Sequence, residues 1–117
     1  MKIYSFSQES GKSISAFDSD FIMSRIVRTG AEAHIGCVYL GQQGMIGYHQ
    51  AACPQLLLIV QGEGYVRGEE AAFTAVHAGQ AVYWELGEWH ETRTDTGLTA
   101  IIIESDSLNP ADRMPLV

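Results

Sequence analysis

The sequence has few basic residues, few cysteines and few prolines, and the first two shortages each exclude a class of protein. It carries 7 Lys and Arg against 14 Asp and Glu, which gives a formal net charge of −7. Nucleic-acid surfaces and membrane-binding patches need clustered Lys and Arg, so we expect neither kind of partner. No apolar stretch approaches the roughly 20 residues of a membrane-spanning helix. The stretch MKIYSFSQESGKS turns polar too early for a signal peptide, and we therefore expect a cytoplasmic protein.

The two cysteines, Cys37 and Cys53, are too few for a disulfide framework in a cytoplasmic chain of 117 residues. The chain contains no CxxC pair and no Cys/His spacing typical of a zinc site. We expect both cysteines to be free thiols that are mostly buried. Cys53 keeps a second interpretation, as a metal ligand, because it follows His49 by four residues.

The apolar segments are short and are separated by glycine or polar turns, as is typical of an all-β protein. The chain has 12 glycines and 3 prolines, and no segment shows the sustained 3.6-residue period of a long helix. The spacing of the turns predicts an antiparallel sandwich or barrel. We expect one domain over residues 1–117, with an irregular arm or edge strand at 1–20 and a surface tail at 105–117. The predicted strands are 22–28, 34–40, 56–60, 64–68, 81–86 and 98–104.

Two segments combine strand-like patterns with a histidine. In the first, His49 and Ala51 share one face of an extended chain, and the run LLLIV at 56–60 has no alternation, so both of its faces should be covered. In the second, His90 shares its face with two threonines, Thr92 and Thr94. The other face of that segment carries Trp89, Glu91 and Arg93.

The second segment resembles the second motif of the cupin superfamily of small jelly-roll barrels, commonly written G-x5-P-x-G-x2-H-x3-N. Gly79, Gly87 and His90 follow this spacing. Glu85 stands in the place of the proline, and Thr94 stands in the place of the asparagine.

The first segment resembles the first cupin motif, G-x5-H-x-H-x3,4-E-x6-G, less completely. His49 and Gly62 match, but Ala51 and Gln55 replace the second histidine and the glutamate, and the opening glycine is displaced by one residue to Gly44. The resemblance covers residues 44–94 and implies a small single-domain cupin, an antiparallel jelly-roll β barrel. It implies little about activity, because one fold carries many functions.

In cupins, three histidines and a glutamate hold a divalent metal. By this resemblance His49, Gln55 and His90 are the candidate metal ligands, whereas the Ala51 side chain cannot ligate at all. Gln55 offers a dipole in place of a charge, so we expect a divalent ion (zinc, nickel, iron or manganese) to be held only at low occupancy. A missing ligand could come from Glu88, from Cys53 or from a bound substrate.

The alternative is that His49 and His90 are neutral interior histidines, hydrogen-bonded to Gln55, a threonine or water. The remaining histidines, His34 and His77, match neither motif. The side chains of Trp84, Trp89, Tyr48 and Tyr83 more often belong to a core or an interface than to a ligand platform.

We favour a binding module that holds a small polar or anionic metabolite in the barrel, in a pocket that includes Tyr48, Gln55, Glu88 and Thr92. A metal-dependent enzyme, such as an isomerase, epimerase or dioxygenase, is the alternative, with Glu88 or Tyr48 as the acid or base. A purely structural or partner-binding barrel is the third interpretation. We also expect a homodimer, because small jelly rolls have sheet edges that need cover, and exposed aromatics such as Trp89 could supply its apolar surface.

Overall fold

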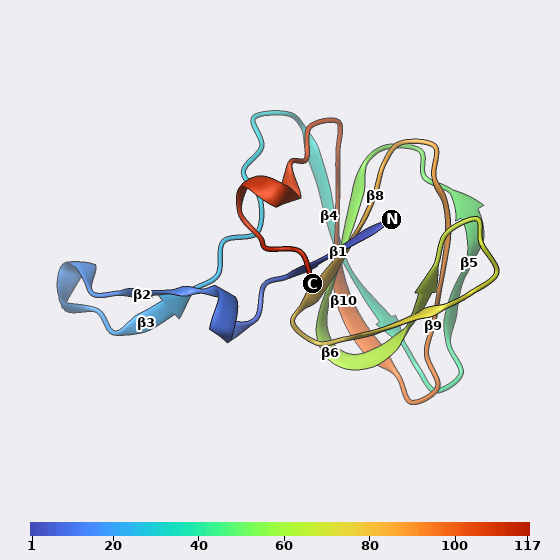
Figure 1. The fold of residues 1–117 in the computed structure, drawn as a ribbon, viewed down its shortest axis with the longest axis horizontal. Helices are drawn as coiled ribbons and strands as arrows, with labels where there is room; N and C mark the ends of the chain where they lie inside the picture. The colour runs from blue at the N-terminus through green and yellow to red at the C-terminus, as the bar shows by residue number, and fades with distance from the viewer.

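The apolar run LLLIV lies in β6 (Gln55–Arg67), the longest strand of the barrel and the one that joins its two sides (Figure 1). In the computed structural model, which describes residues 1–117, β6 pairs with β8 and β10 along its first half. Along its second half it pairs with β7 and β9. All of these pairings are antiparallel, and the predicted all-β antiparallel barrel is confirmed.

The main side of the barrel has the strand order β1-β8-β6-β10-β4, and β5, β9, β7 and the second half of β6 form the other side. Besides β6, the strands are β1 (Lys2–Ser5), β2 (Lys12–Ile14), β3 (Phe21–Met23), β4 (Ala33–Leu40), β5 (Met45–Gln50), β7 (Thr74–His77), β8 (Gln80–Trp84), β9 (Trp89–Arg93) and β10 (Leu98–Ser105). Three single-turn 3-10 helices complete the chain: η1 (Gln8–Ser10), η2 (Ala16–Asp18) and η3 (Pro110–Asp112). None of the helices is long and apolar enough to cross a bilayer.

The strand β6 is covered on both faces, as its continuous apolar sequence predicts. Leu57 and Ile59 point into the barrel, where they belong to its main hydrophobic core. Leu56 and Leu58 point outward into a second cluster, which the chain termini help to form. Alternation of side chains along the strand therefore divides one apolar run between two cores.

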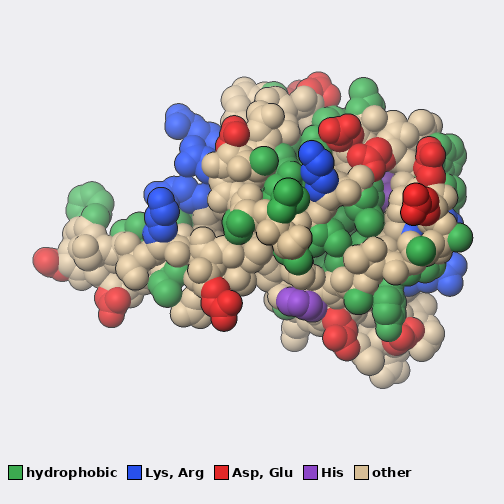
Figure 2. Space-filling model, viewed as in Figure 1, with side chains coloured by type: hydrophobic (Ala, Val, Ile, Leu, Met, Phe, Trp, Pro, Cys, Tyr) green, Lys and Arg blue, Asp and Glu red, His purple; other side chains and the backbone are tan.

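The two terminal regions of the chain differ in how they lie relative to the outer face of the main sheet. The C-terminal tail lies against it, with Leu108 and Met114 buried in the outer cluster. The N-terminal region instead sends out an arm, the hairpin of β2 and β3, whose strands pair only with each other (Figures 1 and 2). Of the strand predicted at 22–28, only the beginning is extended, as part of β3.

The expectation that both thiols are mostly buried is wrong for Cys37, which is exposed on β4, whereas Cys53 is half-buried. Cys37 pairs in register with Ile101, which packs on the outer cluster, so its side chain points out of the barrel. The tail does not extend over this edge strand, and the thiol is left in contact with solvent.

Candidate functional site

The structure brings His49 and His90 together at one end of the barrel. They are directly opposite each other on the neighbouring strands β5 and β9, and their ring centroids are 4.3 Å apart. Residues in register on adjacent strands point to the same face of a sheet, so the two imidazoles share the inner face. His49 is exposed at the open end, while His90 is buried, with 2% of its surface exposed.

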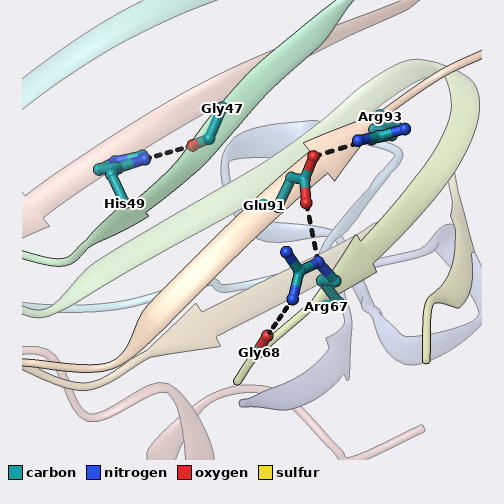
Figure 3. A network of polar contacts seen from close by, with 6 residues as sticks. All are labelled: Gly47, His49, Arg67, Gly68, Glu91 and Arg93. Carbon is teal, nitrogen blue, oxygen red and sulfur yellow. Dashed lines mark hydrogen bonds and ion pairs between the residues drawn. The ribbon is translucent and has the colours of Figure 1, made fainter. Parts of the chain in front are cut away.

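Each imidazole donates a hydrogen bond from Nδ1 to a backbone carbonyl of its own strand region. The His49 Nδ1 lies 2.6 Å from the carbonyl oxygen of Gly47 (Figure 3), and the His90 Nδ1 lies 3.4 Å from that of Glu88. A carbonyl oxygen only accepts, so Nδ1 carries the proton in both rings. In the neutral rings, each Nε2 is therefore a free hydrogen-bond acceptor.

The indole of Trp84 stacks on His90 from the opposite side of the barrel. The ring centroids are 4.4 Å apart and the planes are inclined by 23°. The stacked pair leaves two buried polar atoms without a partner in the protein, Nε1 of Trp84 and Nε2 of His90. The indole N–H is a donor and the imidazole nitrogen an acceptor, so the two atoms are of complementary type.

The surroundings of His90 keep its imidazole neutral. Burial is the largest influence and lowers the pKa of His90, and the neighbouring His49 lowers it further. The carbonyl of Glu88 and the carboxylates of Glu88 and Glu104 act in the opposite direction but do not reverse the shift.

Gln55 and Glu104 extend the site across the main sheet. Gln55 is in register with Trp84 on β8 and with Glu104 on β10, so the three side chains point to the same inner face. The Cys53 thiol donates a hydrogen bond of 3.5 Å to Oε2 of Glu104. Burial, followed by this contact with Glu104, raises the pKa of Cys53.

Sequence reasoning missed Glu104, which brings a carboxylate to the strand next to Gln55. A signal was present in the sequence, because every second residue of β10 lies on one face of the strand. Glu104 shares its face with three apolar residues, Leu98, Ala100 and Ile102. Only the pairing of β10 with β6 shows that this face is the inner one.

The predicted pocket residue Tyr48 is not brought to the histidines. Side chains alternate along β5, and Tyr48 lies on the outer face, stacked on Trp89 with centroids 5.2 Å apart. The guanidinium of Arg67 covers the same ring at 4.1 Å. Tyr48 thus contributes to the outer surface and cannot serve as acid or base for a ligand between His49 and His90.

The carboxylate of Glu88 has both of its oxygens occupied by other partners. Its Oε1 accepts a hydrogen bond of 2.9 Å from the backbone N–H of Glu85, and its Oε2 pairs with the ammonium of Met1. Burial opposes ionisation, but these two contacts prevail and lower the pKa of Glu88. Thr92 does face inward with His90 and is buried, at 1% exposure.

The outer face of β9 carries an ion network on the opposite side of the strand from the site. Buried Glu91 lies between Arg93 and Arg67, with N–O distances of 2.8 Å and 2.7 Å (Figure 3). The two guanidinium groups lower the pKa of Glu91. This arrangement follows the alternation expected from the sequence of residues 89–94.

The side chains around the two imidazoles fit a divalent metal only in part. The two Nε2 lone pairs of His49 and His90 suit such an ion, and the unpaired Nε2 of buried His90 favours a ligand of some kind at this point. The structure places no group of three or more His, Cys, Asp and Glu side chains where they could hold a metal. The residues present therefore supply two strong ligands, one fewer than the three protein ligands usual in a catalytic zinc site.

The two largest cavities of the molecule lie elsewhere. One, of about 760 Å³, is lined by the 68–74 loop, the 86–89 turn and Met1. The other, of about 810 Å³, lies between the start of the arm and the turn at His77–Gln80. Neither includes His49 or His90 in its lining.

Comparison with solved structures identifies the cupin fold. A cupin superfamily protein of Desulfitobacterium hafniense has a TM-score of 0.60 and 11% identity over 68% of this chain and 72% of its own. An RmlC-like cupin of Shewanella frigidimarina has a TM-score of 0.60 and 18% identity over 68% and 70% of the two chains. A Thermotoga maritima protein described as a predicted oxalate decarboxylase has a TM-score of 0.56 and 19% identity over 61% and 64%. No protein-family model matches the sequence, and no curated protein matches it significantly.

Proposed function

Because the chain has the cupin fold, we propose that it is a binding module for a small, uncharged, hydroxylated metabolite at the barrel end around His49 and His90. The observation that carries this proposal is the pair of unpaired buried atoms on the stacked rings of Trp84 and His90. A hydroxyl group is the kind of partner that suits both atoms, because it can accept from an indole N–H and donate to an imidazole Nε2.

Most of the other polar groups at the site are hydrogen-bond acceptors, so they favour a ligand that donates hydrogen bonds over an anion. The Nε2 of His49 is a second acceptor, and the carboxylate of Glu104 is a third acceptor on the same inner face. Gln55 can both donate and accept. An anion would meet the neutral imidazole of His90 and the nearby carboxylate of Glu104, so we prefer an uncharged polar ligand to an anionic one.

In this proposal a divalent metal is only a weakly bound, secondary ligand. His49 and His90 would hold it, and Gln55 would add only a neutral amide oxygen. Three good protein ligands are usual in catalytic zinc sites, so we expect weak binding. The metal-dependent isomerase, epimerase or dioxygenase would need a third strong ligand, and no observation favours it over simple binding.

The experiment is a titration of metal-free protein followed by tryptophan fluorescence. Trp84 and Trp89 are the two tryptophans, and a Trp89→Phe background leaves only the indole that stacks on His90. The probes are glycerol, glucose and inositol as neutral hydroxylated compounds, with acetate and phosphate as anions. We expect saturable changes with at least one neutral probe and none with the anions.

His90→Phe is the informative variant, because it keeps the stacked ring and removes the Nε2 acceptor. We expect a loss of affinity of about fivefold or more, since one hydrogen bond to a buried group contributes about 1–3 kcal/mol. The matched control is His77→Phe, at an exposed histidine outside the site. Equal binding by His90→Phe and wild type, or preferential binding of acetate or phosphate, would refute the proposal.

A further inference from the structure

The outer face of the main sheet is left uncovered where it reaches its edge strand, β4. Ile35 and Tyr39 are 68% and 78% exposed, and Cys37 between them is also exposed. These three residues are in register with Ile103, Thr99 and Ile101 respectively. Because Ile101 and Ile103 pack on the buried outer cluster, the uncovered strip of β4 (Ile35, Cys37 and Tyr39) continues that apolar surface.

The arm carries a second set of exposed apolar side chains. Phe17 at its tip is fully exposed, and Phe21, Ile22 and Met23 on β3 are 40–44% exposed. The hairpin has three residue pairs and extends away from the barrel (Figure 2). A lone two-stranded hairpin is marginally stable in water, so the arm needs a surface to pack on.

We propose that the arm of one copy packs on the β4 strip of a second copy, and that the exchange is reciprocal, giving an arm-exchanged homodimer. Each chain carries both halves of the contact, so a two-fold axis satisfies both arms and both strips and closes the assembly. The contact also covers an edge strand of the main sheet, as edge strands require.

The exposed area is sufficient for a stable dimer. Phe21 and Met23 share one face of β3 and Ile22 lies on the other, so only the first two can pack on the strip together with Phe17. With roughly 200 Å² for a fully exposed large side chain, this face of the arm and the strip offer on the order of 700 Å² per contact. The two contacts of a reciprocal exchange then bury on the order of 1,400 Å², which is within the usual size range of a specific interface. From the sequence, Trp89 is expected to contribute to the dimer interface. It is a weaker candidate than the arm and the strip, because Tyr48 already stacks on it.

The first test is light scattering with variants in each half of the contact. The wild type should be a dimer at micromolar concentration, and both an arm variant (Phe17→Ser with Phe21→Ser) and a strip variant (Ile35→Ser with Tyr39→Ser) should be monomers. Leu86→Ser is the matched control, since Leu86 is 67% exposed but lies outside both surfaces. A monomeric wild type, or a dimer that survives both sets of changes, would overturn the proposal.

Mixing the two variants tests the exchange itself. A heterodimer would also show that neither variant is monomeric merely because it is misfolded. The intact arm of the strip variant can still pack on the intact strip of the arm variant, so the mixture should form a heterodimer with one contact, at a higher protein concentration than the wild-type dimer needs. A second measurement uses the thiol of Cys37 as a natural probe on the strip. In a Cys53→Ser background, Phe21→Cys should be cross-linked to Cys37 between chains by a short bis-maleimide. Cross-linking within one chain only would show that the arm folds back on its own barrel.

Discussion

At the scale of single residues, the site keeps buried polar atoms that folding alone does not require. An unpaired buried donor or acceptor costs about 1–3 kcal/mol, and Trp84 and His90 each present one. Residues that lower stability without a structural benefit are frequent in binding sites, where the ligand completes the missing hydrogen bonds. These two unpaired atoms are the observation on which the proposed binding of a ligand rests.

The first prediction at this scale concerns pH. Burial lowers the pKa of His90 below its ordinary value of 6.5, so the folded protein keeps the ring neutral when the unfolded chain becomes protonated. Its contribution to stability is complete above about pH 6.5 and is lost as the pH falls from there toward the folded-state pKa. Thermal melts of metal-free protein from about pH 7.5 to about pH 5 should show a falling melting temperature.

The same melts on His90→Phe identify the group responsible. This variant should lose less stability over that interval, whereas His77→Phe should behave as the wild type does. The carboxylates of Glu88 and Glu91 also have lowered pKa values, so their contribution is lost only at more acidic pH. An unchanged slope in His90→Phe would contradict the assignment.

The second prediction concerns the two replaced ligand positions. Ala51→His with Gln55→Glu adds an imidazole near His49 and a carboxylate on the inner face of β6. We expect the double variant to bind zinc, nickel or iron(II) stoichiometrically in calorimetry, and the wild type to bind weakly. Added metal at a hundredfold excess over its dissociation constant should stabilise the variant by about 2.7 kcal/mol.

The wild type and the single variants are the controls for this comparison. Tight binding of one equivalent by the wild type would show that His49 and His90 find a third ligand among the natural residues. If the double variant did not bind, the two imidazoles would not direct their Nε2 atoms to a common point, although their ring centroids are only 4.3 Å apart.

At the scale of elements, the long strand β6 connects the two sides of the barrel, because it pairs with strands of both. Its register with β10 shifts between Ile59 and Gln61, and Gly62 just beyond has a φ of 84°. A side chain at Gly62 would collide with the carbonyl oxygen of Gly97 and with the Cα of Leu98. The strand can pass from one side of the barrel to the other because this position has no Cβ.

The third prediction is that Gly62→Ala destabilises the protein by about 3 kcal/mol or more, from strain at a positive φ together with the collision. Urea denaturation measures the change. Gly36→Ala is the matched control, because no atom lies within 4 Å of the side chain it adds. Equal stability of the two variants would show that the bend does not require glycine.

At the scale of the whole molecule, the termini decide which parts of the barrel surface are covered. The principal extents of 47 × 32 × 23 Å describe an elongated shape, with the arm extending from the barrel. The tail packs against the outer cluster through Leu108 and Met114, while the strip on β4 stays open. The covered and uncovered parts of one apolar face thus depend on segments far from it in sequence.

The fourth prediction tests this role of the tail. Met114→Ala should cost about 2–4 kcal/mol, because it leaves a cavity beneath Tyr4 and the β6 side chains of the outer cluster. Leu116→Ala, two residues further along at an exposed position, should have little effect. Denaturant melts compare the two variants, and similar losses in both would contradict a specific role for the buried methionine.

The sequence by itself determined the fold class and much of the local order. Short β-branched segments and frequent turns predict an all-β barrel, the unbroken LLLIV run predicts a strand covered on both faces, and motif spacing selects His49 and His90. These features could be predicted because alternation and turn chemistry act between residues close in the chain. They place His90, Thr92 and Thr94 on one face without any knowledge of their neighbours.

Only the tertiary structure decided which side chains meet. The stacking of Trp84 on His90 and the place of Glu104 beside Gln55 depend on the pairing of β6 with β8 and β10, which no local pattern specifies. Alternation alone already places Tyr48 on the opposite face from its neighbour His49, and only its stacking on Trp89 depends on the pairing of β5 with β9. Contacts between distant segments follow from burial of the whole apolar surface at once, so the chain has to be folded before they can be known.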